Sequence, residues 1–405
     1  MLEARRTPSG NYGQLWTAYN AAQTNEKEVF LKLLFELCQG IEDLEPSGGR
    51  PPLRLRDMIF CLVFKVYLTL PARRAMPDLR EAHAKGFISK VPHFNSIPNY
   101  MGLESLMPTI KQLIRASSAP LRGIENRFAV DSTGLSVPLR KRYYNRHKGR
   151  FQTKRTYVKL HVICGVQTHI ITSAQVSAGD AADSPYFKGM VGETARDFEM
   201  SEVYADGAYT GNENRHYVLV WGAEPYIPFR SDSAEGTHKS TIWKRMLQQF
   251  QDKESEFWKR YYTRNNIEST FSMMQRKFGD SLSSKTFQAQ VNEALCMVLC
   301  HNLCVIIGAM YELGIEPDFY ADIEVNHSAK QIVEQNLLKV RERLAALTVK
   351  QPSLLEFVEN RQEGKVEDLT LNGKNFSSNV PTPKIKKKSR EEDSKQQSLF
   401  PIEGK

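Results

Sequence analysis

The chain has 405 residues, a hydrophobic content of 41% and a formal charge of +9 at pH 7. A chain of this length can bury the cores of two domains. Its six cysteines include no Cys-x-x-Cys pair, which excludes the common zinc spacings. The basic excess favours a polyanionic partner, although ribosomal and membrane-surface proteins share it.

The first 115 residues are expected to form a helical N-terminal domain. Apolar side chains recur at helical spacing from Val29 to Leu37, a second helix is predicted over residues 55–70, and prolines divide the segment that follows into short helices. Short helices with basic turns suit recognition of a DNA end, and they equally suit a structural module.

The pattern changes near residue 124, and residues 116–310 are predicted to form an α/β domain. Strands followed by alternating helices and strands indicate a mixed sheet flanked by helices, with the proline-containing strand at an edge. The predicted strands are 127–131, 157–166, 170–176, 202–206 and 224–229, and the predicted helices are 184–195, 211–221, a polar stretch over 231–256, and 257–278, which ends at Gly279.

Two further segments follow, a helical extension over residues 311–359 and a basic tail over 360–405 that is predicted to be disordered. The apolar runs 58–70 and 296–310 are shorter than the ~20 residues of a membrane span, so both are expected to be buried helices. Cys296, Cys300 and Cys304 recur every four residues and are expected to be buried hydrophobes rather than a metal site. Free thiols and a polar N-terminus without a signal peptide favour a cytoplasmic protein.

The helix predicted over residues 257–278 carries two stripes. One is polar and comprises Tyr261, Arg264, Glu268, Ser272 and Gln275, and the next is wholly apolar. Such a helix can pack against a core while Glu268 faces a cleft. A solvent-exposed helix with an Arg264–Glu268 ion pair is the alternative.

Two aspartates complete a possible trio with Glu268. Asp131 and Asp206 each follow a predicted strand, and acids at strand ends of an α/β sheet can converge at its rim. Three carboxylates are hard oxygen ligands suited to two Mg²⁺ or Mn²⁺ ions, which catalyse phosphodiester displacement in many enzymes. An aspartate after a strand is also a common turn former or helix cap.

A basic segment follows Asp131. Residues 136–160 contain nine Lys or Arg, no acid, and interleaved aromatics, a composition that favours DNA contact over a solvated hairpin. The predicted DNA contacts are Arg140, Lys141, Arg142, Arg146, Lys148, Arg150, Lys154 and Arg155.

Several segments between residues 48 and 307, among them VDSTG, EVYADGAYTG and the 261–280 helix, resemble the DDE transposases of bacterial and archaeal insertion sequences. The resemblance implies a ribonuclease-H-like catalytic domain whose metal-binding acids are Asp131, Asp206 and Glu268. It also implies a Tyr-Arg-Glu-Lys signature, which Tyr261, Arg264 and Glu268 match in spacing. Gln275 stands at the fourth position, and Lys277 nearby is a candidate to replace the missing charge.

The resemblance implies a transposase that binds inverted-repeat ends, cleaves DNA with two Mg²⁺ or Mn²⁺ ions and joins the 3′-OH ends to a target. It also implies double-stranded DNA as partner, a homodimer or higher synaptic oligomer, and a nucleoid-associated protein of the prokaryotic cytoplasm. Two alternatives stay open: a related nuclease that hydrolyses without strand transfer, and a transposase-derived DNA-binding protein without catalysis. His161, His169 and His301 are expected to have structural or surface roles, because the two-metal mechanism needs no histidine.

Overall fold

The computed structural model describes residues 15–42, 53–137, 157–229 and 241–320. The chain divides into two compact units, Met1–Glu342 and Arg343–Lys405, and every described residue lies in the first. The predicted helical extension from residue 321 onward, the tail over 360–405 and the basic segment over 140–155 lie outside the described residues.

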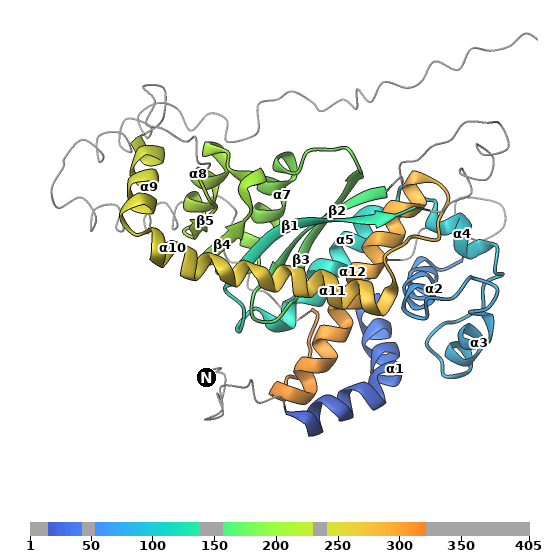
Figure 1. Ribbon diagram of the computed structural model, residues 1–405. Coiled ribbons are helices and arrows are strands. Elements are labelled where there is room, and N and C mark those ends of the chain that lie inside the picture. Colours follow the sequence, from blue (N-terminus) through green and yellow to red (C-terminus); the bar gives the residue numbers. More distant parts are fainter. Residues whose placement is uncertain (1–14, 43–52, 138–156, 230–240, 321–405) are drawn as a thin grey trace, which may run out of the picture. The chain divides into compact units, whose positions relative to one another are not determined.

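A five-stranded mixed sheet forms the centre of the fold (Figure 1). Its strands lie in the order β3-β2-β1-β4-β5, where β1, β2 and β3 are antiparallel and β4 and β5 run parallel to β1. The bounds are β1 Arg127–Ser136, β2 Tyr157–Gly165, β3 Ile171–Ala178, β4 Glu202–Ala205 and β5 Glu224–Tyr226. The predicted mixed sheet is confirmed, and the proline-containing strand does lie at an edge.

Strand β1 is longer than predicted. Asp131 lies in its middle, opposite Val162 of β2, instead of at its end. Pairing with β2 continues to Ser136, whose backbone also bonds Asp280 and Leu282 in the loop that follows residue 278. The segment Ser132–Gly134 resembles a turn in sequence, but a long antiparallel partner holds it extended.

One face of the sheet is covered by α7 (Ser184–Ala195) and α8 (Asn212–Val220). Phe128 and Val130 of β1 point to this side and pack against Phe187 and Val191 of α7. Because side chains alternate along a strand, the intervening residues Ala129, Asp131 and Thr133 point to the opposite face.

The opposite face carries α5 (Leu106–Ser118), α11 (Asn266–Phe278) and α12 (Phe287–Leu313), as Figure 1 shows. Ile267, Phe271, Met274 and Phe278 form the apolar stripe of α11 and are buried there, as the sequence predicted. This packing presents the neighbouring polar stripe of α11 to the Asp131 side of β1.

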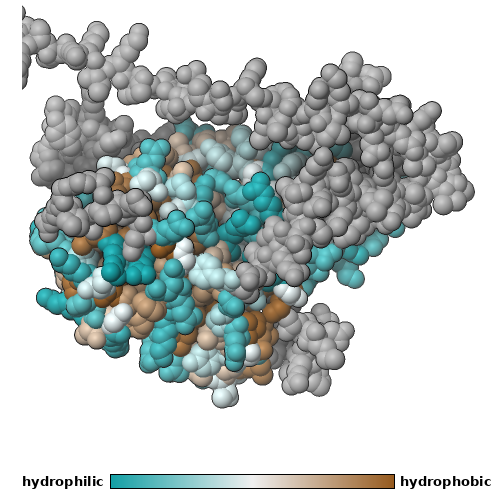
Figure 2. Space-filling view, turned by 180° about the vertical axis from the view of Figure 1, so that it is seen from behind, coloured by the Kyte–Doolittle hydropathy of each residue, from teal (hydrophilic) through white to brown (hydrophobic). Residues whose placement is uncertain are grey.

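Helix α12 is the central helix of the core. Its length and apolar composition would suit a membrane span, but 67% of its most apolar window is buried inside the fold. Cys296 and Cys300 are fully buried on it, which confirms their role as packed hydrophobes. On the face that Figure 2 displays, hydrophilic and hydrophobic residues are interspersed over the described surface.

The N-terminal helices belong to the same core as the sheet. They comprise α1 Trp16–Cys38, α2 Leu55–Tyr67, α3 Met76–Ala84, α4 Ser96–Met101 and α5, followed by the short helix η1 Ala119–Leu121. Helices α1, α2 and α5 pack on α12, and α5 also packs on β3. The predicted helical character is present, whereas no separate core marks a boundary near residue 115.

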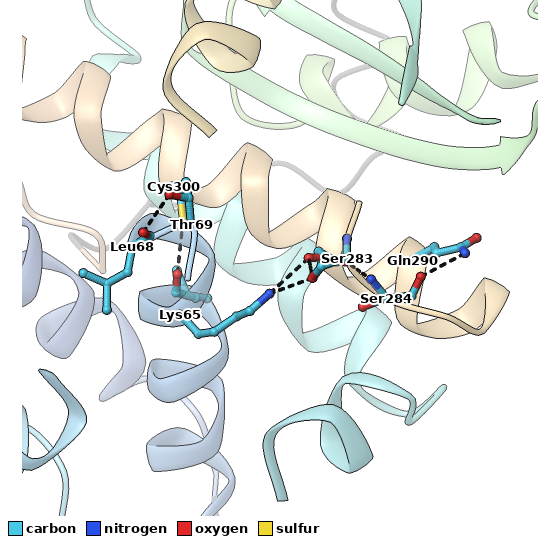
Figure 3. Close-up of polar contacts among 9 residues, drawn as sticks. Lys65, Leu68, Thr69, Ser283, Ser284, Gln290 and Cys300 are labelled. Atoms are coloured by element: carbon cyan, nitrogen blue, oxygen red, sulfur yellow. Dashed lines mark hydrogen bonds and ion pairs between the residues drawn. The ribbon is translucent and has the colours of Figure 1, made fainter. Parts of the chain in front are cut away.

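A buried ion pair fastens α2 to α12 (Figure 3). Lys65 Nζ lies 3.2 Å from Glu293 Oε1 and donates to Ser283 Oγ at 2.9 Å. The other carboxylate oxygen, Glu293 Oε2, accepts from the backbone amides of Ser283 and Ser284 at 3.0 and 2.7 Å. The loop between α11 and α12 is therefore held by hydrogen bonds between its serines and the Lys65–Glu293 ion pair.

The helix predicted over 257–278 is interrupted. Helix α9 (Thr241–Asp252) is followed by α10 (Glu254–Tyr261), a 3₁₀ turn η3 (Tyr262–Asn265) and then α11. The change occurs at Tyr-Thr-Arg-Asn, where three of the four residues, Tyr262, Thr263 and Asn265, are weaker helix formers, and a 3₁₀ stretch within a helix often marks a functional hinge or a strained sequence. The predicted end at Gly279 is confirmed, with a φ of 89° that favours glycine.

Candidate active site

Asp131 lies on the sheet face that α11 covers, and its side chain is 16% exposed. The backbone amide of Ser132 donates to Asp131 Oδ1 at 2.8 Å. Asp131 Oδ2 accepts from Arg264 Nη2 at 2.6 Å. Both carboxylate oxygens are therefore held, one by the strand itself and one by the turn before α11.

Arg264 joins two of the three predicted acids. Its Nη1 lies 3.4 Å from Glu268 Oε1, one helical turn further along, while its Nη2 bonds Asp131. The Glu268 side chain is 65% exposed, so it forms the outer wall of the site. The predicted Arg264–Glu268 pair is present, and it is one half of a bridge to the sheet.

Asp206 comes directly after β4, the parallel neighbour of β1. Its side chain accepts from the backbone amide of Ala208 at 2.9 Å and thereby caps the 3₁₀ turn η2 (Gly207–Tyr209). Buried Arg215 on α8 braces the following segment, because its guanidinium donates to the Thr210 and Pro228 carbonyl oxygens at 2.9 Å each. The loop that carries Asp206 is thus fixed from both sides.

The three acids influence one another electrostatically. Burial raises the pKa of Asp131, and the negative charges of Asp206 and Glu268 raise it further. The Arg264 guanidinium and the Ser132 amide act in the opposite direction and lower it. Asp206 at the end of β4 and Glu268 on α11 are therefore near enough to Asp131 to influence its charge.

This site has the chemistry to hold a divalent cation. Three carboxylates supply the hard oxygen donors that Mg²⁺ and Mn²⁺ prefer, and the guanidinium of Arg264 shows that the site accepts a positive charge between Asp131 and Glu268. In the described part of the chain, no three His, Cys, Asp or Glu side chains are already close enough to hold one ion together. A cation shared by Asp131 and Glu268 therefore requires Arg264 to move.

Two other members of the polar stripe face the same region. Burial raises the pKa of Tyr261, which lies within the electrostatic influence of Arg264 and all three acids. Gln275 Nε2 donates to Thr133 Oγ1 at 3.1 Å, two residues along β1 from Asp131. Despite the 3₁₀ turn, two residues of the predicted stripe, Arg264 and Gln275, bond side chains of β1.

Lys277 is directed elsewhere. Its ammonium bonds the carboxylate of Glu26 on α1, which also accepts from the Tyr67 hydroxyl at 2.8 Å. This bond ties the end of α11 to the N-terminal helices and favours a structural role over a phosphate contact. The basic residues predicted to bind DNA between 140 and 155 lie outside the described residues.

The three histidines have structural contacts. His161 is fully buried and bonds Ser177 Oγ at 2.8 Å, and burial lowers its pKa to about 4. His169 Nδ1 lies 2.9 Å from Thr270 Oγ1, and His301 Nε2 lies 2.9 Å from the His169 carbonyl oxygen. The second and third therefore connect the β2–β3 turn to α11 and α12.

Sequence reasoning missed three residues near the acids: Asp183, Tyr209 and Arg215. Asp183 directly precedes a Ser-Pro helix start, where an aspartate is expected as an ordinary cap. Tyr209 and Arg215 are buried, but neither stands in a pattern that signals burial. Tyr209 lies within the segment EVYADGAYTG, and this segment is the sequence signal that indicates its position close to Asp206 in the chain.

Residues 122–303 match the family model described as the transposase DDE domain, a range that includes all three acids. A solved structure, the cryo-EM structure of a piggyBac transposase synaptic complex with hairpin DNA, aligns over 83% of this chain and 82% of that chain, with 12% identity and a TM-score of 0.33. Domains of the matched family generally depend on divalent metal ions to cleave DNA. Residues 122–303 of this chain are thus similar to the transposase DDE domain.

Proposed function

We propose that this chain is an insertion-sequence transposase that binds the inverted-repeat ends of its element, cuts them and joins the 3′-OH ends to target DNA. The observation that supports the proposal is the bridge formed by Arg264, which bonds Asp131 on β1 at 2.6 Å and lies 3.4 Å from Glu268 on α11. Asp206 follows β4, the parallel neighbour of β1.

Asp131, Asp206 and Glu268 would hold Mg²⁺ or Mn²⁺. When two such ions are bound, they activate the attacking oxygen and stabilise the leaving oxygen of a phosphodiester. The residues of the chain do the positioning: β1 and the Ser132 amide orient Asp131, and the capped turn η2 orients Asp206. Once Arg264 leaves Asp131, its planar guanidinium is suited to bind a DNA phosphate beside Tyr261.

The basic residues between 140 and 155 would supply affinity for DNA next to Asp131, since they follow it directly in the chain. Synapsis of two element ends would require a homodimer or higher oligomer. The free thiols are compatible with action on the nucleoid in the cytoplasm of a prokaryote.

Incubation with Mg²⁺ and labelled DNA that carries the inverted repeats flanking the gene tests the proposal. We expect cleavage at the element ends, and joining of pre-cut 3′-OH ends to a target plasmid. Cleavage without joining of pre-cut ends would identify a nuclease of the same fold, and binding without cleavage would identify a DNA-binding protein that has lost its chemistry.

A further inference from the structure

A fourth carboxylate lies behind the site, on the other face of β1. Asp183 occupies the N-cap of α7, where an aspartate usually accepts hydrogen bonds from the first turn, yet its side chain makes no capping bond. Asp183 Oδ1 instead accepts from Ser132 Oγ at 2.9 Å and lies 3.1 Å from Lys159 Nζ and 3.3 Å from His161 Nδ1. The charge of Asp183 is therefore turned from its own helix toward the sheet.

Ser132 connects this carboxylate to Asp131. The hydroxyl of Ser132 bonds Asp183 on the α7 side, while its backbone amide bonds Asp131 Oδ1 at 2.8 Å. Adjacent residues of a strand point to opposite faces. Ser132 therefore bonds Asp183 on the α7 face through its hydroxyl, and it bonds Asp131, which points to the opposite face, through its backbone amide. Asp183 thus fixes the amide that orients a metal-binding acid.

Tyr209 supplies a second and independent observation. Its side chain is 1% exposed, and its hydroxyl has no hydrogen-bond partner within the described structure. Burial raises the pKa of Tyr209, and the charges of Asp183, Asp131 and Asp206 raise it further. The buried hydroxyl is therefore within the electrostatic influence of three carboxylates and makes no hydrogen bond within the described structure, although an unmade buried hydrogen bond costs about 1–3 kcal/mol.

The charge balance around Asp183 depends on Lys159. The low pKa of His161 leaves that ring neutral at pH 7, so Lys159 is the cation that faces the Asp183 carboxylate. Loss of the Asp183 charge would leave the Lys159 ammonium, which also donates to the Ala181 carbonyl oxygen at 2.9 Å, without its carboxylate partner.

We propose that Asp183 and Tyr209 form a second layer of polar groups that tunes divalent-cation binding by Asp131 and Asp206. Asp183 is a positioning residue that acts on Asp131 through Ser132, and the Tyr209 hydroxyl is a donor available to these carboxylates. The inference rests on the proposed metal-dependent function. Groups that orient metal ligands typically contribute 10–100-fold to metal affinity.

The test is Mn²⁺ affinity of the full chain, measured from the EPR signal of free Mn²⁺, together with the melting temperature in EDTA. We expect Asp183→Asn to weaken Mn²⁺ binding about 10–100-fold. Ser132→Ala should also weaken Mn²⁺ binding. Tyr209→Phe should melt at the same or a higher temperature in EDTA, because it removes an unpaired hydroxyl, and yet bind Mn²⁺ more weakly. Asp180→Asn, an exposed acid of the same turn, is the matched control and should bind as the wild type does.

Wild-type Mn²⁺ affinity in Asp183→Asn would overturn the inference. If that variant fails to fold, wild-type affinity in Ser132→Ala would overturn it equally. Asp131→Ala separates this outcome from failure of the proposed function. If Asp131→Ala binds Mn²⁺ as tightly as the wild type, the metal site itself is wrong; if Asp131→Ala loses Mn²⁺ and Asp183→Asn does not, only the role of Asp183 is wrong.

Discussion

Arg264 is the residue that balances the charge of the site. Its guanidinium is 13% exposed and pairs with a carboxylate that is 16% exposed, so neither group is well solvated. In the proposed function, a divalent cation bound by Asp131 would compete with this guanidinium for the same oxygen. We expect Arg264 to hold the Asp131 carboxylate in place until a cation and DNA replace it.

This competition predicts the behaviour of Arg264→Gln. Without metal, the variant leaves the Asp131 charge unpaired and should lose about 1–3 kcal/mol of stability. Mg²⁺ binds the native state and replaces the missing charge, so it should raise the melting temperature of Arg264→Gln more than that of the wild type. Arg276→Gln, at an exposed position of the same helix, is the control, and an equal Mg²⁺ effect in wild type and Arg264→Gln would rule out the competition.

Gln275 offers a second test at the residue scale. A Lys at this position would add a positive charge on the polar stripe, and a charge-assisted bond to phosphate contributes about 1.5–3 kcal/mol against about 0.5–1.5 for a neutral bond. We expect Gln275→Lys to increase end binding or cleavage, most visibly at low salt, and Gln275→Ala to do modest harm. Binding isotherms over a salt series would show it, and weaker binding by Gln275→Lys would contradict it.

Lys277 provides the companion prediction. Its bond to Glu26 joins α11 to α1, so Lys277→Ala should lower the melting temperature and leave DNA affinity close to that of the wild type. Loss of DNA binding with an unchanged melting temperature would instead restore Lys277 as the phosphate contact. The same salt series, with Gln275→Lys alongside, compares the two positions directly.

Among the elements, the loop between α11 and α12 depends on Glu293. Burial alone would raise the pKa of this carboxyl, but Lys65 and the bonds from Ser283 and Ser284 hold it below its ordinary value of 4.5. A carboxyl whose pKa is lower in the folded state contributes stability above its unfolded pKa, and this contribution is lost as the pH falls through the folded value.

Glu293→Gln should therefore destabilise the protein by about 3–5 kcal/mol at pH 7, because it leaves the Lys65 charge buried without its partner. The deficit relative to the wild type should shrink as the pH falls below about 4.5. Urea denaturation at several pH values measures both effects, with Glu312→Gln at an exposed position of the same helix as the control. A deficit that does not change with pH would contradict the assigned charge pairing.

Elements with a local signal could be predicted from the sequence. The helix at Ser184–Ala195 matches its prediction at both ends, because the Asp-Ser-Pro start is local chemistry. The length of β1 could not be predicted, since the pairing of Ser132–Ser136 depends on a strand that begins at Tyr157. Likewise, the partners Lys277 and Glu26 are separated by 251 residues in the chain, and no sequence pattern predicts a contact between residues so far apart.

The same distinction explains the candidate site. Asp131, Asp206 and Glu268 stand in motifs that the sequence shows, whereas their placement on neighbouring elements depends on the β1–β4 pairing and on the packing of α11. Asp183 was missed because an aspartate at a helix start has an ordinary explanation. Its lack of a capping bond is visible only in the structure.

For the whole molecule, the net charge of +9 and the basic segment predict a strong dependence of DNA binding on salt. Each phosphate contact contributes roughly 0.9 to the slope of log affinity against log salt concentration. Charge reversal of Arg140, Lys141 and Arg142 together should flatten this slope. Fluorescence anisotropy over a salt series measures it, and an unchanged slope would mean that the segment does not contact DNA.

The central claim is that Asp131, Asp206 and Glu268 form one catalytic metal site, and cleavage of DNA carrying the element ends in Mg²⁺ tests it most directly. Asp131→Ala, Asp206→Ala and Glu268→Ala should each abolish nicking and retain end binding in a gel-shift assay, because basic residues supply the affinity and the acids hold the metal. Full nicking activity in any one of the three variants would remove that residue from the site and contradict the claim.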